Sequence, residues 1–369
     1  MKSQVNRQVR LKSRPTGIPQ SDHFEIVATP LLDLADKQFL IRNEFLSVEP
    51  AMRGWVSAIA NYSTPVGIGE VMRAFAAGTV YREGDTVMGM LGWQEYAISD
   101  GSTITRKVKE NDLPLSLSLG VLGLNGVTAY FGLLDVGQPR PGDTVVVSTA
   151  AGAVGSAVGQ IAKLMGCRTV GLTGGPIKSK LCREEFGYDE VIDYKAGALG
   201  DALVRACPRG IDVYFDNTAG AISDAVLPQL AVGARVVICG TASVASWDPP
   251  PTGPRVERHL LVKRARMSGL LVLDYQHRYE EAVARLAGWV REGRLRYRED
   301  IVDGIERCPA QLPNFTGEKT SASGLSIFAI IELASQQRER LYVCFWHQAD
   351  IGLRNRGGVE GVQRWRGKG

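Results

Sequence analysis

The segment Thr144-Val-Val-Val-Ser-Thr-Ala-Ala-Gly-Ala-Val-Gly155 decides the fold of this chain. Its β-branched start predicts a strand that is buried on both faces. The residues Val154–Met165 that follow carry an apolar stripe at helical spacing, so they predict a helix. A Gly-rich turn between a buried strand and a helix is the beginning of a βαβ unit.

Working outward from this turn, strand and helix patterns alternate over the next 130 or so residues. Helices are expected at Lys178–Phe186 and Tyr279–Glu292. Strands are expected at Arg168–Leu172, Glu190–Asp193, Asp212–Asp216, Arg235–Cys239 and Arg266–Leu273. This alternation predicts an α/β fold with a doubly wound parallel sheet.

The N-terminal part has a different pattern, with short β-type runs separated by turn residues. Examples are Phe24–Ala28, Phe39–Asn43, Thr86–Met90 and Tyr96–Ile98, which together predict an irregular β barrel or sandwich. We therefore expect a β-rich domain over residues 1–122 and a dinucleotide-binding domain over residues 123–293. Residues 294–331 are expected to return to the first domain, and residues 332–369 form an atypical basic tail.

Composition excludes several classes of function. The net charge is +4, and residues 334–369 hold seven Lys/Arg against three Asp/Glu, so the rest of the chain is neutral and is not expected to bind nucleic acid. The six cysteines show no metal-ligand spacing and suit a reducing compartment. No signal peptide and no membrane-spanning run is recognisable, which indicates a cytoplasmic protein.

The Gly-rich turn predicts a dinucleotide site. Ala150, Gly152 and Gly155 fill the three glycine positions of the dinucleotide fingerprint. Gly152 allows a pyrophosphate to approach the backbone, Gly155 allows the helix to pack on the strand, and the free N–H groups of the helix attract phosphate. The alternative is a Gly-rich βα turn without a ligand.

The end of the second strand indicates which nicotinamide cofactor binds. An NAD site usually has an acidic residue there, whereas this chain has Leu172-Thr-Gly-Gly175 followed by Lys178. A cation without a neighbouring carboxylate suits a 2′-phosphate, so NADP(H) is favoured. The alternative is that Lys178 is simply a solvated helix residue.

Two further strand ends carry candidate residues. Asn217 follows the predicted strand 212–216, where its amide is placed to bind the cofactor or to act as an ordinary turn residue. Cys239-Gly240-Thr241 ends the next strand. We interpret Cys239 as a packing residue, because no His or Lys lies near it in the sequence to activate a nucleophile.

Several segments together resemble the zinc-independent branch of the medium-chain dehydrogenase/reductases, and within it the prostaglandin reductase and alkenal double-bond reductase group. The resemblance covers residues 8–318. It is carried by Asn43-Glu-Phe-Leu-Ser-Val-Glu-Pro-Ala-Met-Arg-Gly54, Gly69-Glu-Val-Met-Arg73, Gly126-Val-Thr-Ala-Tyr-Phe-Gly132, Ala150–Gly155, Phe215-Asp-Asn217 and Met267-Ser-Gly-Leu-Leu-Val-Leu-Asp-Tyr275.

This resemblance implies a Rossmann domain joined to a GroES-like catalytic domain, and a homodimer. It implies NADPH-dependent reduction of the carbon–carbon double bond of an α,β-unsaturated ketone or aldehyde, with hydride transfer to the β-carbon and no metal. Zinc-free relatives that reduce quinones make an NADPH quinone reductase the first alternative. The second is an NADPH-binding protein whose altered C-terminus impairs catalysis.

The resemblance also implies individual site residues. Tyr62 falls at a pocket Tyr that orients a carbonyl, and Trp247 falls where many relatives carry a Tyr in that role. The remaining residues match cofactor contacts, from the pyrophosphate turn through the 2′-phosphate and adenosine end to the nicotinamide. They are Gly152, Ala153, Val154, Gly155, Lys178, Tyr194, Asn217, Cys239, Gly240, Thr241, Ala242, Ser243, Val244, Ala245, Leu270, Leu271 and Val272.

The chain departs from the family pattern at four places, one of which is a hairpin between Ala77 and Arg82 that is several residues shorter than usual. Ala51 replaces a frequent Tyr, which should open the pocket. Trp247 has an indole N–H but no acidic phenol. After Gly317-Glu318 the sequence continues with Lys319 instead of the family's closing Asn, and we interpret the tail as the product of a frame change or read-through. Leu325–Ile331 is expected to supply a replacement strand.

Overall fold

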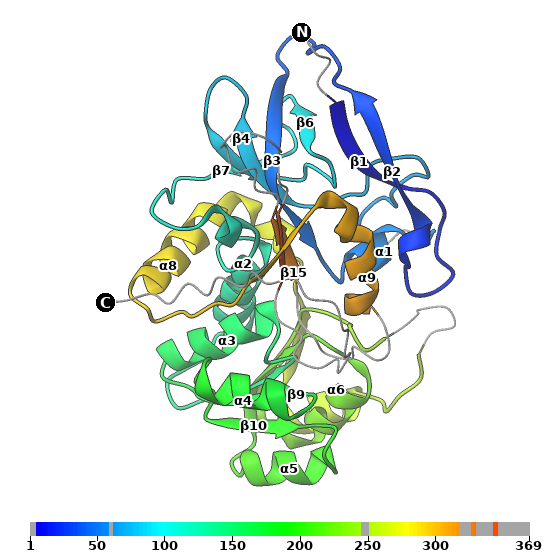
Figure 1. Ribbon diagram of the computed structural model, residues 1–369. Coiled ribbons are helices and arrows are strands. Elements are labelled where there is room, and N and C mark those ends of the chain that lie inside the picture. Colours follow the sequence, from blue (N-terminus) through cyan, green and yellow to red (C-terminus); the bar gives the residue numbers. More distant parts are fainter. Residues whose placement is uncertain (1–4, 59–61, 245–250, 317–325, 330–341, 346–369) are drawn as a thin grey trace, which may run out of the picture.

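The computed structural model describes residues 5–58, 62–244, 251–316, 326–329 and 342–345 (Figure 1). The strands of the N-terminal region gather at one end of the molecule. The helices and strands of the 144–269 region gather at the other end. This arrangement, a Rossmann-type parallel sheet beside an antiparallel β-rich domain, confirms the predicted fold class.

The parallel sheet has the strand order β10-β9-β8-β11-β12-β13 among the described strands. Numbered along the chain, these strands have the order 3-2-1-4-5-6 of dinucleotide-binding folds. The chain adds strands outward on one side of the first strand and then, from the fourth strand on, outward on the other side. The reversal lies between β8 and β11. The strand bounds are β8 Thr144–Ser148, β9 Arg168–Thr173, β10 Glu190–Asp193, β11 Ile211–Asp216, β12 Leu230–Ile238 and β13 Arg266–Gly269.

Alternating side chains build one core on each face of this sheet. Val145 and Val147 of β8 belong to the larger core, whereas Val146 belongs to the second one. On the larger side lie α2 (Leu124–Phe131), α3 (Ala153–Leu164), α4 (Pro176–Glu184) and α8 (Tyr279–Arg291), and on the other side lie α5 (Leu199–Ala206) and α6 (Gly220–Val226). β8 is buried along its whole length, as its β-branched sequence predicts.

The antiparallel sheet has the order β15-β3-β4-β5-β7, with β6 also paired to β3. Its strands are β3 Phe39–Val48, β4 Ala76–Val80, β5 Thr86–Gly89, β6 Tyr96–Ser99, β7 Ile104–Lys107 and β15 Ser326–Ala329. Two smaller pairs accompany it, β1 (Val5–Leu11) with β2 (Phe24–Pro30) and β14 (Asp300–Asp303) with β16 (Tyr342–Phe345). The short helices α1 (Met52–Trp55), α7 (Glu257–Lys263) and α9 (Cys308–Thr316) complete the described helical elements.

Strand β15 is the replacement strand expected within Leu325–Ile331. It pairs antiparallel with β3, Ser326 lying opposite Val48 and Ala329 opposite Phe45. The chain therefore returns to the N-terminal sheet after forming the parallel one (Figure 1). The frame-change interpretation and the exact domain limits stay predictions, and Gly317, Glu318 and Lys319 lie outside the described residues.

The last predicted strand, 266–273, is shorter than expected. β13 ends at Gly269, which lies opposite Ile238, the final residue of its neighbour β12. Without a partner backbone beyond this point the ladder cannot continue, and the chain turns into a 3₁₀ segment at Val272–Arg278. Residues 270–272 therefore lie after the end of the strand and not within it.

An ion cluster around the buried Arg106 joins the two domains. The side chain of Arg106 on β7 is 2% exposed and donates to both carboxylate oxygens of Glu110 and, at 2.9 Å, to Glu280 on α8. Since β7 belongs to the antiparallel sheet and α8 covers the parallel one, this cluster spans the domain boundary. Among the described residues there is no helix long and apolar enough to span a membrane.

Candidate active site

The candidate site begins where β8 and β11 end, at the reversal point of the parallel sheet. Ligands of open α/β sheets bind at such points, outside the carboxyl ends of the strands. Gly152 precedes α3 in an extended conformation, and its N–H donates to the Thr149 carbonyl at 2.8 Å. A Cβ on Gly155 would lie 2.2 Å from the carbonyl oxygen of Thr149, so only glycine allows α3 to pack this closely on the turn.

The first turn of α3 is open to an anion. Among the described residues no side chain caps the helix, so the N–H groups of its first turn keep their capacity to donate to a ligand. Thr149 has a φ of 54° and a buried hydroxyl oxygen without a hydrogen-bond partner among the described residues. An uncapped helix start beside an orphaned hydroxyl fits a bound pyrophosphate.

The second βα turn brings together the residues predicted for the 2′-phosphate and adenosine end. Lys178 lies in the first turn of α4 and is partly exposed. A Cβ on Gly174 would meet the Tyr194 hydroxyl at 2.7 Å, so Tyr194 lies against the same turn. The carboxylate of Asp193 accepts hydrogen bonds from the backbone N–H groups of Gly175, at 2.9 Å, and Lys195, at 3.0 Å. Two backbone groups of the turn thus hold this carboxylate.

Asn217 is held in place by the end of β8. Its side-chain amide donates to the Ser148 carbonyl at 2.7 Å, and its backbone N–H donates to the Ser148 hydroxyl at 2.8 Å. The buried carboxylate of Asp216 accepts the N–H groups of Thr218 and Ala219, both at 2.9 Å. The turn after β11 is therefore rigid, and the amide that was predicted to contact the cofactor ties two strand ends together.

The loop after β12 is hydrogen-bonded to the loop after β11. The N–H groups of Cys239 and Gly240 donate to the Asp216 carbonyl, and the Ser243 hydroxyl donates to Thr218 at 2.7 Å. Burial, with a contribution from the charge of Asp216, raises the pKa of the Cys239 thiol to about 12. This residue therefore stays a thiol, in agreement with its interpretation as a packing residue.

The apolar residues after β13 close the same region. The Leu270 N–H donates to Ile238 at 3.0 Å. A Cβ on Gly132 would lie 2.6 Å from the Leu270 side chain and 2.8 Å from Phe215, so these side chains pack over that glycine. Leu271 and Val272 are partly buried beside them. The predicted pyrophosphate turn, Asn217, the 239–244 loop and residues 270–272 thus all follow carboxyl ends of the parallel strands.

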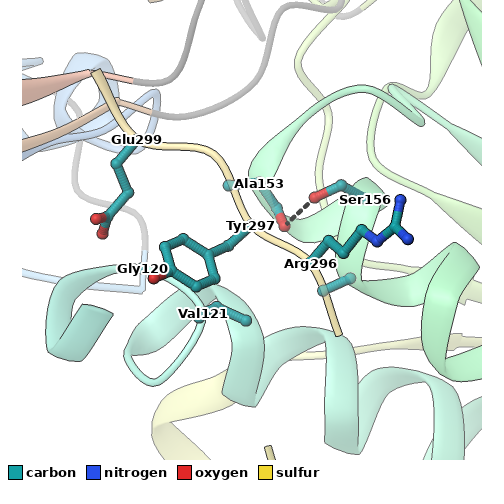
Figure 2. Close-up of a pocket in the computed structure, with 8 residues that line it drawn as sticks. Gly120, Val121, Ala153, Ser156, Arg296, Tyr297 and Glu299 are labelled. Atoms are coloured by element: carbon teal, nitrogen blue, oxygen red, sulfur yellow. Dashed lines mark hydrogen bonds between the residues drawn. The ribbon is translucent and has the colours of Figure 1, made fainter. Parts of the chain in front are cut away.

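A small cavity of about 10 Å³ lies against the first turns of α3, room for a single water. Figure 2 shows the Tyr297 ring and the Glu299 carboxyl on the segment that follows α8. Ala153 and Ser156 lie on α3, and Gly120 and Val121 lie on the other side of the Tyr297 ring. Burial raises the pKa of Glu299 to about 7, opposed by its hydrogen bond from the Ser116 hydroxyl at 2.8 Å.

The predicted catalytic Tyr62 lies in the loop after α1 and is 53% exposed. Partial burial raises the pKa of its phenol. The Trp55 indole N–H opposes that rise, the Glu49 charge adds to it, and the Arg73 charge opposes it. The Trp55 indole nitrogen is buried and makes no hydrogen bond of normal geometry among the described residues, and the Arg73 guanidinium lies 5.8 Å from its ring centroid.

Sequence reasoning named neither Glu49 nor Arg73 as site residues, although both lie in segments that carry the family resemblance. No local signal reports that a glutamate will be buried or which loop will face it. Trp247 and Ala245 lie outside the described residues, so their predicted roles stay predictions. Within the described part of the chain no three His, Cys, Asp or Glu side chains are grouped to hold a metal ion.

Comparison with known proteins matches both halves of the chain. A family described as "N-terminal domain of oxidoreductase" matches residues 7–107, and one described as "Zinc-binding dehydrogenase" matches residues 153–288. The chain is 42% identical to the NADPH-dependent curcumin reductase of Escherichia coli over 83% of its length and 92% of the relative's. It is 36% identical to the NADP(+)-dependent 2-alkenal reductase of Nicotiana tabacum, over 83% and 93% of the two chains.

Two further comparisons agree. Rat prostaglandin reductase 1 is 38% identical, over 81% of this chain and 92% of that protein. The crystal structure of CurA from Vibrio vulnificus has a TM-score of 0.81 at 40% identity, over 88% and 98% of the two chains, and its complex with NADPH has a TM-score of 0.80. The chain therefore belongs to the medium-chain dehydrogenase/reductase family, in the group that contains the curcumin, 2-alkenal and prostaglandin reductases.

Proposed function

We propose that this protein uses NADPH to reduce the carbon–carbon double bond of α,β-unsaturated ketones or aldehydes. The observation that carries the proposal is its identity of 36–42% to three reductases, over more than nine-tenths of the length of each. Two of these relatives are a curcumin reductase and a 2-alkenal reductase, and curcumin and 2-alkenals contain a double bond beside a carbonyl. The geometry of the candidate site agrees with this chemistry.

The residues present suit NADP(H). The uncapped start of α3 and the orphaned Thr149 hydroxyl would hold the pyrophosphate. Lys178 and Tyr194 would hold the 2′-phosphate and the adenosine end, and residues 239–244 and 270–272 would lie along the nicotinamide half. When bound, this cofactor supplies the hydride that is added to the β-carbon of the substrate.

Tyr62 is the proposed proton donor. A phenol with a pKa above its usual range is protonated at neutral pH, so it can donate a hydrogen bond to the substrate carbonyl and then its proton. The positive charge of Arg73 favours the phenolate that this donation leaves behind. Trp247, which lies outside the described residues, is proposed to line the pocket and not to donate a proton.

The purified full chain should oxidise NADPH in the presence of a small enone and form the saturated ketone. Oxidation of the cofactor is followed by absorbance, and the product is identified by mass spectrometry. Reduction of a quinone to its hydroquinone without any saturated ketone would favour the quinone reductase alternative. NADPH binding without turnover on either acceptor would favour a cofactor-binding protein with impaired catalysis.

A further inference from the structure

The turn after β11 contains a strained residue. Ala219 has a φ of 57° and a ψ of −163°, a backbone conformation that is found almost only in glycine. Such strain persists only where the surrounding structure holds it, and it is concentrated at functional sites. Ala219 follows the carboxyl end of β11, at the reversal point of the parallel sheet where the candidate site begins.

The side chain of Asp216 holds this turn in its strained conformation. Its Oδ1 atom accepts the N–H groups of Thr218 and Ala219, both at 2.9 Å, and its Oδ2 atom accepts the hydroxyl of Ser223 on α6. Asp216 is 1% exposed, so these groups take the place of water around the carboxylate. Hydrogen bonds to a carboxylate are about twice as strong as neutral ones, which lets them hold a strained residue.

The carbonyl groups of the same turn hold the loop after β12. The carbonyl oxygens of residues 216–218 accept N–H groups of residues 239–243 at 2.8–3.2 Å. The Ser243 hydroxyl lies 2.7 Å from the Thr218 carbonyl oxygen and 2.9 Å from that of Ala219, so its proton is shared between them. A Cβ on Gly220 would lie 2.7 Å from the Ser243 hydroxyl oxygen, so glycine allows this close approach.

The backbone of residues 217–219 is therefore satisfied from within the protein. The Asn217 N–H donates to the Ser148 hydroxyl, and the next two N–H groups donate to the Asp216 carboxylate. All three carbonyl groups accept from the loop 239–243. Because each backbone polar group of the turn has a protein partner, the turn acts on a ligand through that loop.

We propose that Asp216 positions the nicotinamide half of the cofactor through this turn. Its carboxylate holds residues 217–219, and these hold the loop 239–244, which is assigned to the nicotinamide half. Asp216 touches neither cofactor nor substrate in this scheme, so it is a positioning residue. The inference rests on the proposed function for its effect on the rate, because it assumes that a hydride passes between cofactor and substrate.

Hydride transfer depends steeply on this positioning. A displacement of about 1 Å can cost about 100-fold in rate. The affinity for NADPH depends on the whole cofactor, and its phosphate and adenosine end is assigned to the start of α3, Lys178 and Tyr194, which lie on other turns. A change at Asp216 should therefore lower kcat much more than it weakens NADPH binding.

The first test is D216N, which keeps the shape of the side chain and removes its charge. D216N should lower kcat for enone reduction by about tenfold and change the Kd for NADPH by less than about twofold. Cofactor absorbance measures kcat, and titration of cofactor fluorescence measures Kd. D212N is the matched control, because the Asp212 carboxylate lies near the other end of β11 and accepts the Thr144 N–H at 2.8 Å. It should leave kcat unchanged.

The second test needs no substrate. The reduced nicotinamide ring is fluorescent, so the decay of its anisotropy reports how far the ring moves within the complex. With NADPH bound, the wild type and D212N should show only the slow decay of the whole protein. D216N should add a fast decay, because the loop 239–244 would no longer be held by a rigid turn.

The third test is a rescue. A219G alone should raise the melting temperature, because glycine adopts the conformation of residue 219 without strain. A219G combined with D216N should recover about threefold or more of the kcat lost in D216N, since the turn then needs less support from the side chain. Failure to recover would contradict a role of Asp216 that acts through Ala219.

The outcomes separate the two proposals. If the wild type binds NADPH but forms no saturated ketone, the proposed function is wrong, and the anisotropy decay alone decides the role of Asp216. If folded D216N keeps the wild-type kcat and anisotropy decay, or loses NADPH affinity as strongly as kcat, the positioning role is wrong. Circular dichroism establishes folding. Should D216N fail to fold, S223A removes only the donor to Oδ2, and a loss of kcat at unchanged Kd supports the proposal whereas a wild-type kcat contradicts it.

Discussion

At the scale of single residues, the close approach of α3 to the turn after β8 depends on Gly155. A Cβ at this position would lie 2.2 Å from a backbone oxygen, which cannot move without displacing the turn. G155A should therefore lower the free energy of unfolding by about 1–3 kcal/mol and weaken NADPH binding at least tenfold. Both are measured directly, by urea denaturation and by titration of cofactor fluorescence.

The control for this substitution is Gly288 in α8, where an added Cβ meets no atom within 4 Å. G288A should leave cofactor binding unchanged and raise the free energy of unfolding by about 0.5–1 kcal/mol, because alanine loses less backbone freedom in a helix. Equal losses of binding in both variants would mean that the Gly155 contact does not shape the phosphate site.

The choice between NADPH and NADH is expected to depend on Lys178. K178A should weaken binding of NADPH by about tenfold or more, the strength of one charge-assisted hydrogen bond, and should leave the affinity for NADH nearly unchanged. Lys180, two residues further on, is exposed and lies 3.8 Å from Glu184, so K180A is the control. An equal effect of K178A on both cofactors would show that Lys178 does not contact the 2′-phosphate.

These residues differ in how far the sequence could predict them. Gly152 and Gly155 were predictable because a strand, a glycine turn and a helix are local patterns. The burial of Glu49 was not, because it depends on how distant segments pack together. Asn217 was placed correctly at a strand end, yet its hydrogen bonds to Ser148, 69 residues earlier, become visible only in the folded chain.

At the scale of elements, strand β7 and helix α8 depend on Arg106. Its guanidinium is almost completely buried between Glu110 and Glu280, and its Nη1 atom has no partner among the described residues. R106M would leave the carboxylate of Glu110, which is 12% exposed, without its partner. We expect the free energy of unfolding to fall by about 3 kcal/mol, as for other broken buried ion pairs.

A second ion pair on the same helix gives the control. Arg291 on α8 donates to Asp112 at 2.7 Å and 2.8 Å, but the side chains are 44% and 59% exposed. R291M should lower the free energy of unfolding far less than R106M does, because solvent screens such an exposed pair. Thermal and urea denaturation of the two variants side by side would measure the difference, and similar losses would contradict the assigned role of Arg106.

The elements themselves were predictable where one local pattern dominated. The β-branched run of β8 and the apolar stripe of α3 lie where they were expected. The end of β13 was not predictable, because it is set by where β12 stops and not by the apolar residues 270–272. The sequence predicted a replacement strand in the region of β15. It could not predict which residues of β3 this strand would pair with, because that register is set by the folded structure.

At the scale of the whole molecule, the free side of the parallel sheet supports the proposed homodimer. β13 is the last strand of the sheet in the described chain and pairs there only with β12. The neighbouring helix α7 exposes Leu261 and Val262 by 78% and 56%. An edge strand beside exposed apolar side chains is a surface that proteins commonly cover, and a second copy related by a twofold axis would present the same edge.

L261E should therefore convert a dimer into a monomer. A twofold axis places the new glutamate in both subunits, so two unpaired charges would be buried in the interface. Light scattering coupled to size-exclusion chromatography measures the mass of each species. L32E changes an equally exposed leucine, 76% accessible, in the loop between β2 and β3 and should leave the dimer intact. A wild-type mass of one chain, or a dimer that survives L261E, would mean that this edge is not the contact between subunits.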